Sequence, residues 1–229
     1  MNEKELAAIS LHELTQLTTY CLNVLSCTDE LRGNEDLKDA YEQAKTLEGS
    51  IRKLKIASLM EKRTLICVSG MQGAGKTTMI KNFYGLKTEN LNICLGRGER
   101  IPVMITEKDI QEPLMQASVI ERGENGTYTV TDREMEPEEF AKASAGGDGS
   151  ILYLELCVPY RHLYNSGVSF VLLPGFEKKN DYWKTLIEFA VNSSDAAIFV
   201  FDESSFSQAD NYEQLRQLKD RFGENIIYA

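Results

Sequence analysis

Residues 65–78 read Leu-Ile-Cys-Val-Ser-Gly-Met-Gln-Gly-Ala-Gly-Lys-Thr-Thr. The apolar run 65–68 predicts a short buried strand, and the residues from Lys76 to about Phe83 predict a helix. Between them, Gly70 to Thr77 fits the pattern G-x-x-x-x-G-K-[ST] of a phosphate-binding loop. A strand before the loop and a helix after it are the context that this pattern requires. The sequence therefore predicts a nucleotide-binding domain.

Each fixed position of the loop has a physical reason. Gly70 and Gly75 permit turns and a close backbone approach that a Cβ would hinder. Backbone N–H groups then surround the β-phosphate at the positive end of the helix. Lys76 is expected to reach the β- and γ-oxygens, and the Thr77 hydroxyl to ligate Mg²⁺. The predicted nucleotide-binding residues of the loop are Gly70, Met71, Gln72, Gly73, Ala74, Gly75, Lys76, Thr77 and Thr78, with Thr77 also the predicted metal ligand.

Charge separates this region from the rest of the chain. The 229 residues carry a formal net charge of -10, yet residues 62–106 hold 7 basic and 2 acidic side chains. A short positive segment in an acidic chain suits a small anionic ligand, and it argues against a nucleic-acid surface. With 42% hydrophobic and 26% charged residues, the composition is that of a globular protein.

Other features indicate the compartment. The sequence has no apolar run long enough for a membrane span, and it starts with acidic residues where a signal peptide would be basic. Five cysteines, none in a Cys-x-x-Cys pair, are typical of buried thiols in a reducing compartment. We therefore expect a cytoplasmic location. Two histidines, His12 and His162, argue against a histidine-based metal centre.

Periodicity predicts the remaining elements. Two amphipathic helices over 3–28 and 35–60 are expected to form a hairpin. Beyond residue 64, strands alternate with helices, which is typical of an α/β layer. We expect strands over 116–131, 151–158, 168–173 and 196–201 and from 226, helices over 133–143, 181–192 and 208–222, and irregular structure over 86–106. The fold class is thus α/β: a P-loop NTPase three-layer sandwich with a mainly parallel sheet and an inserted β-rich segment at 107–149, preceded by an N-terminal helical hairpin. The expected domains are 1–61 and 62–229.

Three segments resemble the dynamin family of GTPases. The phosphate loop has Gln72 and a doubled hydroxyl after the lysine, as in that family, and is followed by Asn82-Phe83-Tyr84-Gly85. Residues 95–103, Leu-Gly-Arg-Gly-Glu-Arg-Ile-Pro-Val, resemble its first switch. Residues 168–175, Val-Ser-Phe-Val-Leu-Leu-Pro-Gly, resemble its strand followed by D-x-P-G. The two helices ahead of the domain resemble the start of its helical bundle.

This resemblance implies a slow, assembly-stimulated GTPase with GTP and Mg²⁺ as ligands. It implies Gln72 and Lys76 as catalytic residues, with Gln72 positioning the attacking water, although a solvated loop side chain is the other interpretation of Gln72. Arg97, Arg100 and Gly175 are added as nucleotide-binding residues, and a solvated loop explains the two arginines equally well. A homo-oligomer through the GTPase face, and a peripheral place at a membrane through regions not present here, are also implied.

Departures from the family pattern bear on hydrolysis. Leu172 stands where the family has the aspartate of D-x-P-G, Ile101 where it has the switch threonine, and Gly73 where it often has serine. We therefore expect weak Mg²⁺ dependence and a low intrinsic rate. The guanine-reading N/T-K-x-D motif is expected just beyond residue 229, so the base is implied by resemblance alone.

Two alternatives remain. Residues 197–203, Ala-Ile-Phe-Val-Phe-Asp-Glu, resemble the Walker B element of ATPases, in which Asp202 would hold Mg²⁺ and Glu203 would polarise water. The strand beside the phosphate-loop strand would decide which acid serves magnesium. The other alternative is a nucleotide-binding module that hydrolyses little and works by assembly.

Overall fold

The structure is a computed structural model. It describes residues 11–29, 39, 46–47, 49–51, 53–55, 57–58, 63–86, 101–145, 150–163, 166–175, 188, 190–202 and 209–229. The strands with defined bounds are β1 (Thr64–Ser69), β2 (Val103–Lys108), β3 (Leu114–Arg122), β4 (Tyr128–Glu134), β5 (Ile151–Pro159), β6 (Val168–Leu172), β7 (Ala196–Phe199) and β8 (Ile226–Tyr228). The helices with defined bounds are α2 (Leu11–Asp29), α4 (Lys76–Tyr84), α6 (Pro137–Ser144) and α8 (Ala209–Phe222).

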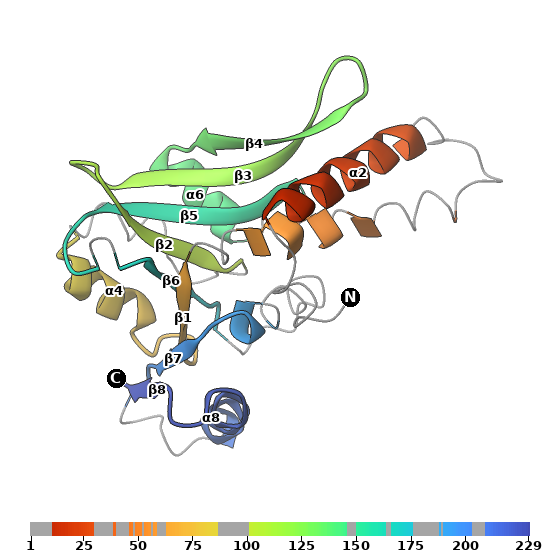
Figure 1. The fold of residues 1–229 in the computed structure, drawn as a ribbon. Coiled ribbons are helices and arrows are strands. Elements are labelled where there is room, and N and C mark those ends of the chain that lie inside the picture. Colours follow the sequence, from red (N-terminus) through yellow and green to blue (C-terminus); the bar gives the residue numbers. More distant parts are fainter. Residues whose placement is uncertain are drawn as a thin grey trace.

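The described strands form one eight-stranded sheet in the order β4-β3-β5-β2-β6-β1-β7-β8 (Figure 1). Strand β1 lies between β6 and β7 and is parallel to both, and β7 is parallel to β8. Strand β2 is antiparallel to β6 but parallel to β5, and β3 is antiparallel to both β4 and β5. The parallel strands around β1 therefore end together, at the edge where the loop after β1 begins.

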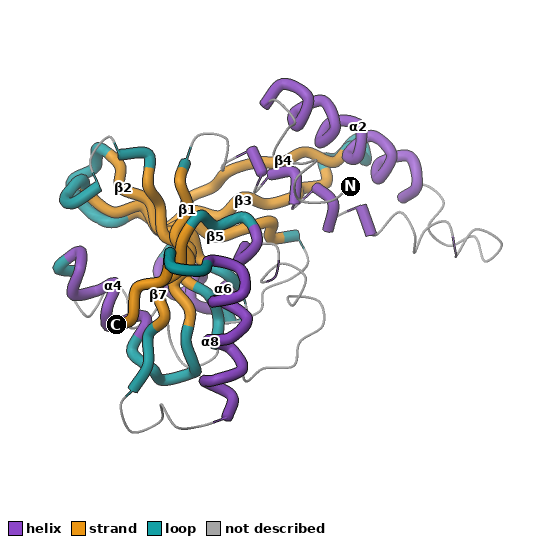
Figure 2. Tube along the Cα trace, turned by 60° about the horizontal axis from the view of Figure 1, so that its bottom comes forward, coloured by secondary structure: helices purple, strands orange, loops and turns teal. Residues whose placement is uncertain are grey.

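Helices cover both faces of this sheet. Leu65 and Cys67 of β1 share a buried cluster with Leu218 of α8, whereas Val68 belongs to a second cluster with Ile80 of α4. Alternate residues of a strand point to opposite faces, so α4 and α8 lie on opposite sides of β1 (Figure 2). The expected mainly parallel sheet flanked by helices is confirmed in this coarse form, and the described sheet also contains three antiparallel strand pairs.

Helix α2 packs at the other end of the sheet, beside β4 (Figure 1). Its Leu22 and Leu25 are buried in the same cluster as Val119 of β3, and the Ser26 hydroxyl accepts a hydrogen bond of 2.9 Å from the Tyr128 N–H. The described residues between 39 and 58 are helical. Most of the segment 30–62 lies outside the described residues, so the hairpin and the division at residue 61 stay predictions.

Several expected bounds are wrong. Residues 103–106 were expected to be irregular but belong to β2, because their apolar side chains are buried between β5 and β6. A helix was expected over 133–143, yet β4 continues to Glu134 and α6 starts at Pro137. Proline at the first helical position suits this start, since its missing N–H has no partner inside a helix. The β-rich segment adds its strands to the common sheet.

A buried carboxylate in the sheet pairs with two half-buried cations. The Glu155 carboxylate of β5 accepts hydrogen bonds from Arg63 at 2.9 Å and from Lys108 of β2 at 3.1 Å. Arg63 also donates to the Thr106 hydroxyl at 2.9 Å. Burial alone raises the pKa of Glu155, but Lys108 and Arg63 outweigh it and hold the pKa below its ordinary value of 4.5.

This network predicts an acid-dependent stability. A carboxylate whose pKa is lower in the folded state stabilises the fold above its unfolded pKa and loses that contribution as the pH falls through the folded value. We expect the free energy of unfolding to drop below pH 4.5, and Glu155→Gln to flatten that drop while lowering stability at pH 7. Urea denaturation between pH 7 and pH 3 measures how the free energy of unfolding of each protein depends on pH. Glu134→Gln, at an exposed position of β4, is the control. An equal pH dependence for Glu155→Gln and wild type would contradict the assignment.

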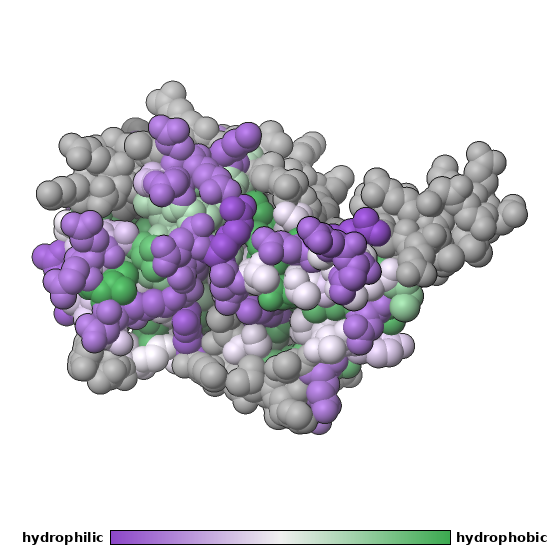
Figure 3. Space-filling view, turned by 90° about the horizontal axis from the view of Figure 1, so that it is seen from above, coloured by the Kyte–Doolittle hydropathy of each residue, from purple (hydrophilic) through white to green (hydrophobic). Residues whose placement is uncertain are grey.

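Hydrophilic residues predominate on the described surface seen in Figure 3, and the hydrophobic ones form small separate patches. Within the described ranges, no helix is both long and apolar enough to cross a bilayer. A surface of this kind fits the acidic composition of the chain.

Candidate nucleotide-binding site

The loop between β1 and α4 has the backbone that a phosphate cradle needs. Gly70, Gly73 and Gly75 have φ values of 147°, 84° and 96°, a region that residues with a Cβ rarely adopt. Gly75 is also the N-cap of α4, so no side chain caps the helix. The first N–H groups of a helix have no acceptor within it, and here they face the loop that precedes them. This end of α4 therefore favours an anion.

Lys76 lies folded into the loop. Its ammonium donates to the carbonyl oxygens of Gly70 at 2.8 Å and Met71 at 2.9 Å, and the residue is 6% exposed. A phosphate group bound within the loop would bring negative charge close to this ammonium, where a low dielectric strengthens the attraction.

Both neighbours of β1 approach the loop closely. A Cβ added to Gly70 would overlap the carbonyl oxygen of Val200, which follows β7, and one added to Gly175 would lie 2.9 Å from the Cα of Gln72. The turn after β6 thus lies directly against the side of the loop that carries Gln72. Gln72 itself is exposed, as are Gly73 and Thr78, while Thr77 is half-buried.

The predicted residues come together in part. Gly70 through Thr78 form one continuous loop and helix start, and Gly175 joins them at Gln72. Arg97, Arg100 and Glu203 lie outside the described residues. Among the residues of the chain that the structure describes, no cluster of three or more His, Cys, Asp or Glu side chains is placed to hold a metal.

Sequence reasoning missed a contact beneath the loop. The Gln214 side chain of α8 donates a 2.7 Å hydrogen bond to the hydroxyl of Ser69, the residue before Gly70, and both residues are buried. Asn211, Gln214 and Leu218 are spaced along the buried face of α8. Polar residues at those helical positions were the signal in the sequence. The contact fixes the point at which β1 turns into the loop.

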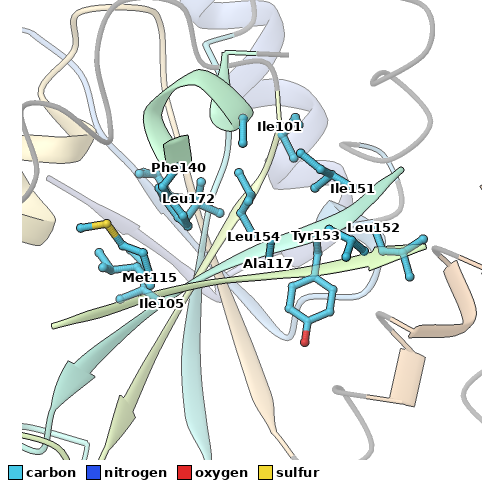
Figure 4. Close-up of a cluster of buried hydrophobic side chains, with 14 of the residues drawn as sticks. Ile101, Ile105, Met115, Ala117, Phe140, Ile151, Leu152, Tyr153, Leu154 and Leu172 are labelled. Atoms are coloured by element: carbon cyan, nitrogen blue, oxygen red, sulfur yellow. The ribbon is translucent and has the colours of Figure 1, made fainter. Parts of the chain in front are cut away.

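Two of the three positions that depart from the dynamin pattern, Leu172 and Ile101, are core residues. Leu172 and Ile101 are each 1% exposed and belong to one hydrophobic cluster that also contains Phe140 of α6. Figure 4 shows the three side chains grouped above the strands, among other apolar residues. Side chains held there cannot serve a metal ion at the loop, so Thr77 and, in the ATPase alternative, Asp202 stay the predicted magnesium ligands.

Restoring an aspartate at residue 172 should therefore damage the fold. Leu172→Asp places a carboxylate among apolar side chains, and an unpaired buried charge is strongly unfavourable. We expect it to lower the free energy of unfolding by roughly 3 kcal/mol or more. Leu172→Met, which keeps volume and polarity, should cost about 1 kcal/mol or less. Chemical denaturation measures both, and a stable Leu172→Asp protein with stronger Mg²⁺ dependence would contradict this placement.

The order of the strands does not decide which acidic residue beside the loop would hold Mg²⁺. Strand β1 pairs with β7 on one side and with β6 on the other, so both of these strands flank the phosphate loop. Strand β6 ends in the buried Leu172, whereas Asp202 follows β7 by three residues and is exposed. The edge next to β7 thus carries the carboxylate that β6 lacks.

Comparison with known proteins gives a distant likeness in fold. No protein-family model and no curated protein matches the chain. Two solved structures of an oligomerised bacterial dynamin pair, described as providing a mechanism for the long-range sensing and tethering of membranes, are similar to it. One has 16% identity and a TM-score of 0.44 over 80% of this chain and 33% of that chain, the other 15% and 0.44 over 79% and 32%. The chain spans about a third of the length of these neighbours, and the similarity concerns the fold alone.

Proposed function

We propose that this chain binds the triphosphate of a nucleotide, GTP, in the loop of residues 70–78. The observation that carries the proposal is the geometry of the loop: three glycines at positive φ, an uncapped helix start, and a buried lysine whose ammonium lies inside the loop. In the complex, backbone N–H groups would hold the β-phosphate. The Lys76 ammonium would turn from carbonyl oxygens to the β- and γ-phosphate oxygens.

Hydrolysis would be slow. A water molecule would attack the γ-phosphorus, and the bond from phosphorus to the β–γ bridging oxygen would break with its electron pair going to GDP. The proton lost by the water would pass to a phosphate oxygen, and GDP and inorganic phosphate would leave. The exposed Gln72 amide can both accept from and donate to that water, and Lys76 stabilises the charge on the oxygens. Bound Mg²⁺ would neutralise charge on the β- and γ-phosphates, with Thr77 as its ligand from the loop. Leu172 and Ile101 are core residues and would give that ion no ligand.

The choice of GTP, self-assembly and action at a membrane rest on the resemblance to dynamins in residues 70–85, 95–103 and 168–175. In this proposal the chain is the nucleotide-binding part of an oligomer that acts peripherally on a membrane. Co-sedimentation with anionic liposomes and light scattering, each with GTP and with GDP, test these parts. A monomer in every nucleotide state would refute the assembly step.

A second candidate is an ATPase that uses Asp202. It is favoured by one observation, the exposed carboxylate three residues beyond the strand that pairs with β1. Aspartate at this place can hold Mg²⁺ through its oxygens. Asp202→Asn would then abolish the Mg²⁺ dependence of nucleotide binding, whereas in the dynamin-like proposal it changes little.

One titration separates the candidates. GTP, ATP and their diphosphates are added to the protein with and without Mg²⁺, and turnover is measured on the same samples. Tighter binding of guanine nucleotides with slow release of phosphate supports the dynamin-like GTPase. Tighter binding of ATP supports the ATPase. Binding without turnover identifies a nucleotide-dependent assembly module, and no binding at millimolar concentration refutes the proposal.

A further inference from the structure

The turn of residues 160–163, which follows β5, contacts the end of α4 far from the phosphate loop. The Arg161 guanidinium donates to the carbonyl oxygen of Tyr84, and Nε2 of His162 lies 2.7 Å from the carbonyl oxygen of Phe83. The last carbonyls of a helix have no donor within it. Side chains that supply donors there, and positive charge above all, stabilise that end of the helix.

A buried carboxylate fixes the shape of this turn. Glu107 of β2 is 8% exposed, and its two oxygens accept the backbone N–H groups of Arg161, His162 and Leu163, each at 2.9 Å. Hydrogen bonds from amides to an ionised carboxylate are about twice as strong as neutral ones. The turn is therefore attached to the sheet through three bonds and does not depend on its own side chains for its position.

Rings and a glycine complete the contact. The Phe83 ring lies 4.5 Å from the His162 ring and 5.5 Å from the ring of Phe170 on β6, measured between centroids. Gly85 has a φ of 62°, and a Cβ there would overlap the Arg161 guanidinium. Glycine thus favours a helix end at which the arginine can reach the last carbonyls.

We propose that Glu107, Arg161 and His162 form a clamp that positions α4 and, through it, the phosphate loop. Helix α4 has nine residues and is about 14 Å long, so it moves as one rigid piece. Its first residue is Lys76 and its last carbonyls are held by the clamp. Holding one end on the sheet thus sets the depth and direction of the other end toward the phosphates. The inference rests on the proposed nucleotide site, and it adds three positioning residues outside that site.

Paired variants test the clamp. Arg161→Ala and His162→Leu remove a donor, whereas Arg161→Lys and His162→Gln keep one. We expect the first pair to raise the Kd for GTP by about fivefold or more, since preorganisation sets affinity. The second pair should keep most of the affinity of the wild type. Arg221→Ala is the matched control, because Arg221 donates to the carbonyls of Asn192 and Ser194 on the opposite face of the sheet.

Hydrogen exchange without nucleotide separates this inference from the proposed function. The clamp predicts faster exchange of the α4 amides in Arg161→Ala and His162→Leu than in Arg221→Ala, whatever the chain binds. Faster exchange together with no nucleotide binding in wild type would refute the proposed function alone. Equal Kd and equal exchange in all variants would refute the clamp. If Arg161→Ala and His162→Leu lower stability as much as Arg221→Ala does but leave the Kd for GTP unchanged, the contact serves stability alone and the inference is overturned.

Discussion

Replacing Lys76 by alanine is expected to weaken the binding of GTP by about 30-fold or more. The residue is 6% exposed and its ammonium already lies in the loop, hydrogen-bonded to the carbonyl oxygens of Gly70 and Met71, so it is in place to meet a phosphate with little rearrangement. A hydrogen bond between charged groups contributes about 1.5–3 kcal/mol, and about 1.4 kcal/mol corresponds to a tenfold change in the binding constant. Isothermal titration calorimetry at fixed ionic strength measures the loss.

Lys81→Ala is the control for this experiment. Lys81 lies in the last turn of the same helix and carries the same charge, so a general electrostatic effect would appear in both variants. We expect its Kd to stay within about twofold of wild type, because Lys81 is half-buried at the end of α4 away from the loop, and salt screens charges at such a distance. Equal losses in the two variants would show that the phosphates are not held in the loop.

Gly70→Ala is expected to disrupt both the fold and the site. Gly70 has a φ of 147°, and a Cβ there would overlap the carbonyl oxygen of Val200, part of the rigid backbone after β7. Either the loop or β7 must shift, and we expect a loss of roughly 3 kcal/mol in the free energy of unfolding. The displaced loop should bind GTP at least about tenfold more weakly.

Gly73→Ala separates crowding from backbone strain. Gly73 also has a positive φ, 84°, but no atom lies within 4 Å of the place that a Cβ would take. Only the conformational cost of about 1–2 kcal/mol applies there. Urea denaturation of the two variants side by side should show the larger loss for Gly70→Ala. Equal losses in the free energy of unfolding would mean that the contact between residue 70 and the Val200 carbonyl oxygen adds no cost.

The sequence predicts best what depends on neighbouring residues. The loop from Gly70 to Thr78 is predictable because strand, glycines, lysine and helix follow one another in the chain. Strands β5, β6 and β7 are predictable within a few residues because each is a short apolar run. The end of helix α8 at Phe222 is predictable, since the apolar positions before it recur at helical spacing.

Contacts between distant parts of the chain could not be predicted in this way. Glu107 and the turn that it holds are 54 to 56 residues apart, and Arg161 is 77 residues from Tyr84. Nothing in the local sequence around Arg161 points to a helix end elsewhere. Ile101 and Leu172 show the same limit: a family pattern gave them the places of metal ligands, while their burial follows from α6 and the strands around them.

A structure of the complex tests the central claim most directly. The chain is crystallised with Mg²⁺ and a GTP analogue that cannot be hydrolysed. The phosphates are predicted to lie within hydrogen-bonding distance of the backbone N–H groups of residues 71–77, with the Lys76 ammonium on their oxygens in place of the carbonyls of Gly70 and Met71. Phosphates bound elsewhere, or a loop in which Lys76 keeps both carbonyls while saturating nucleotide is present, would contradict it.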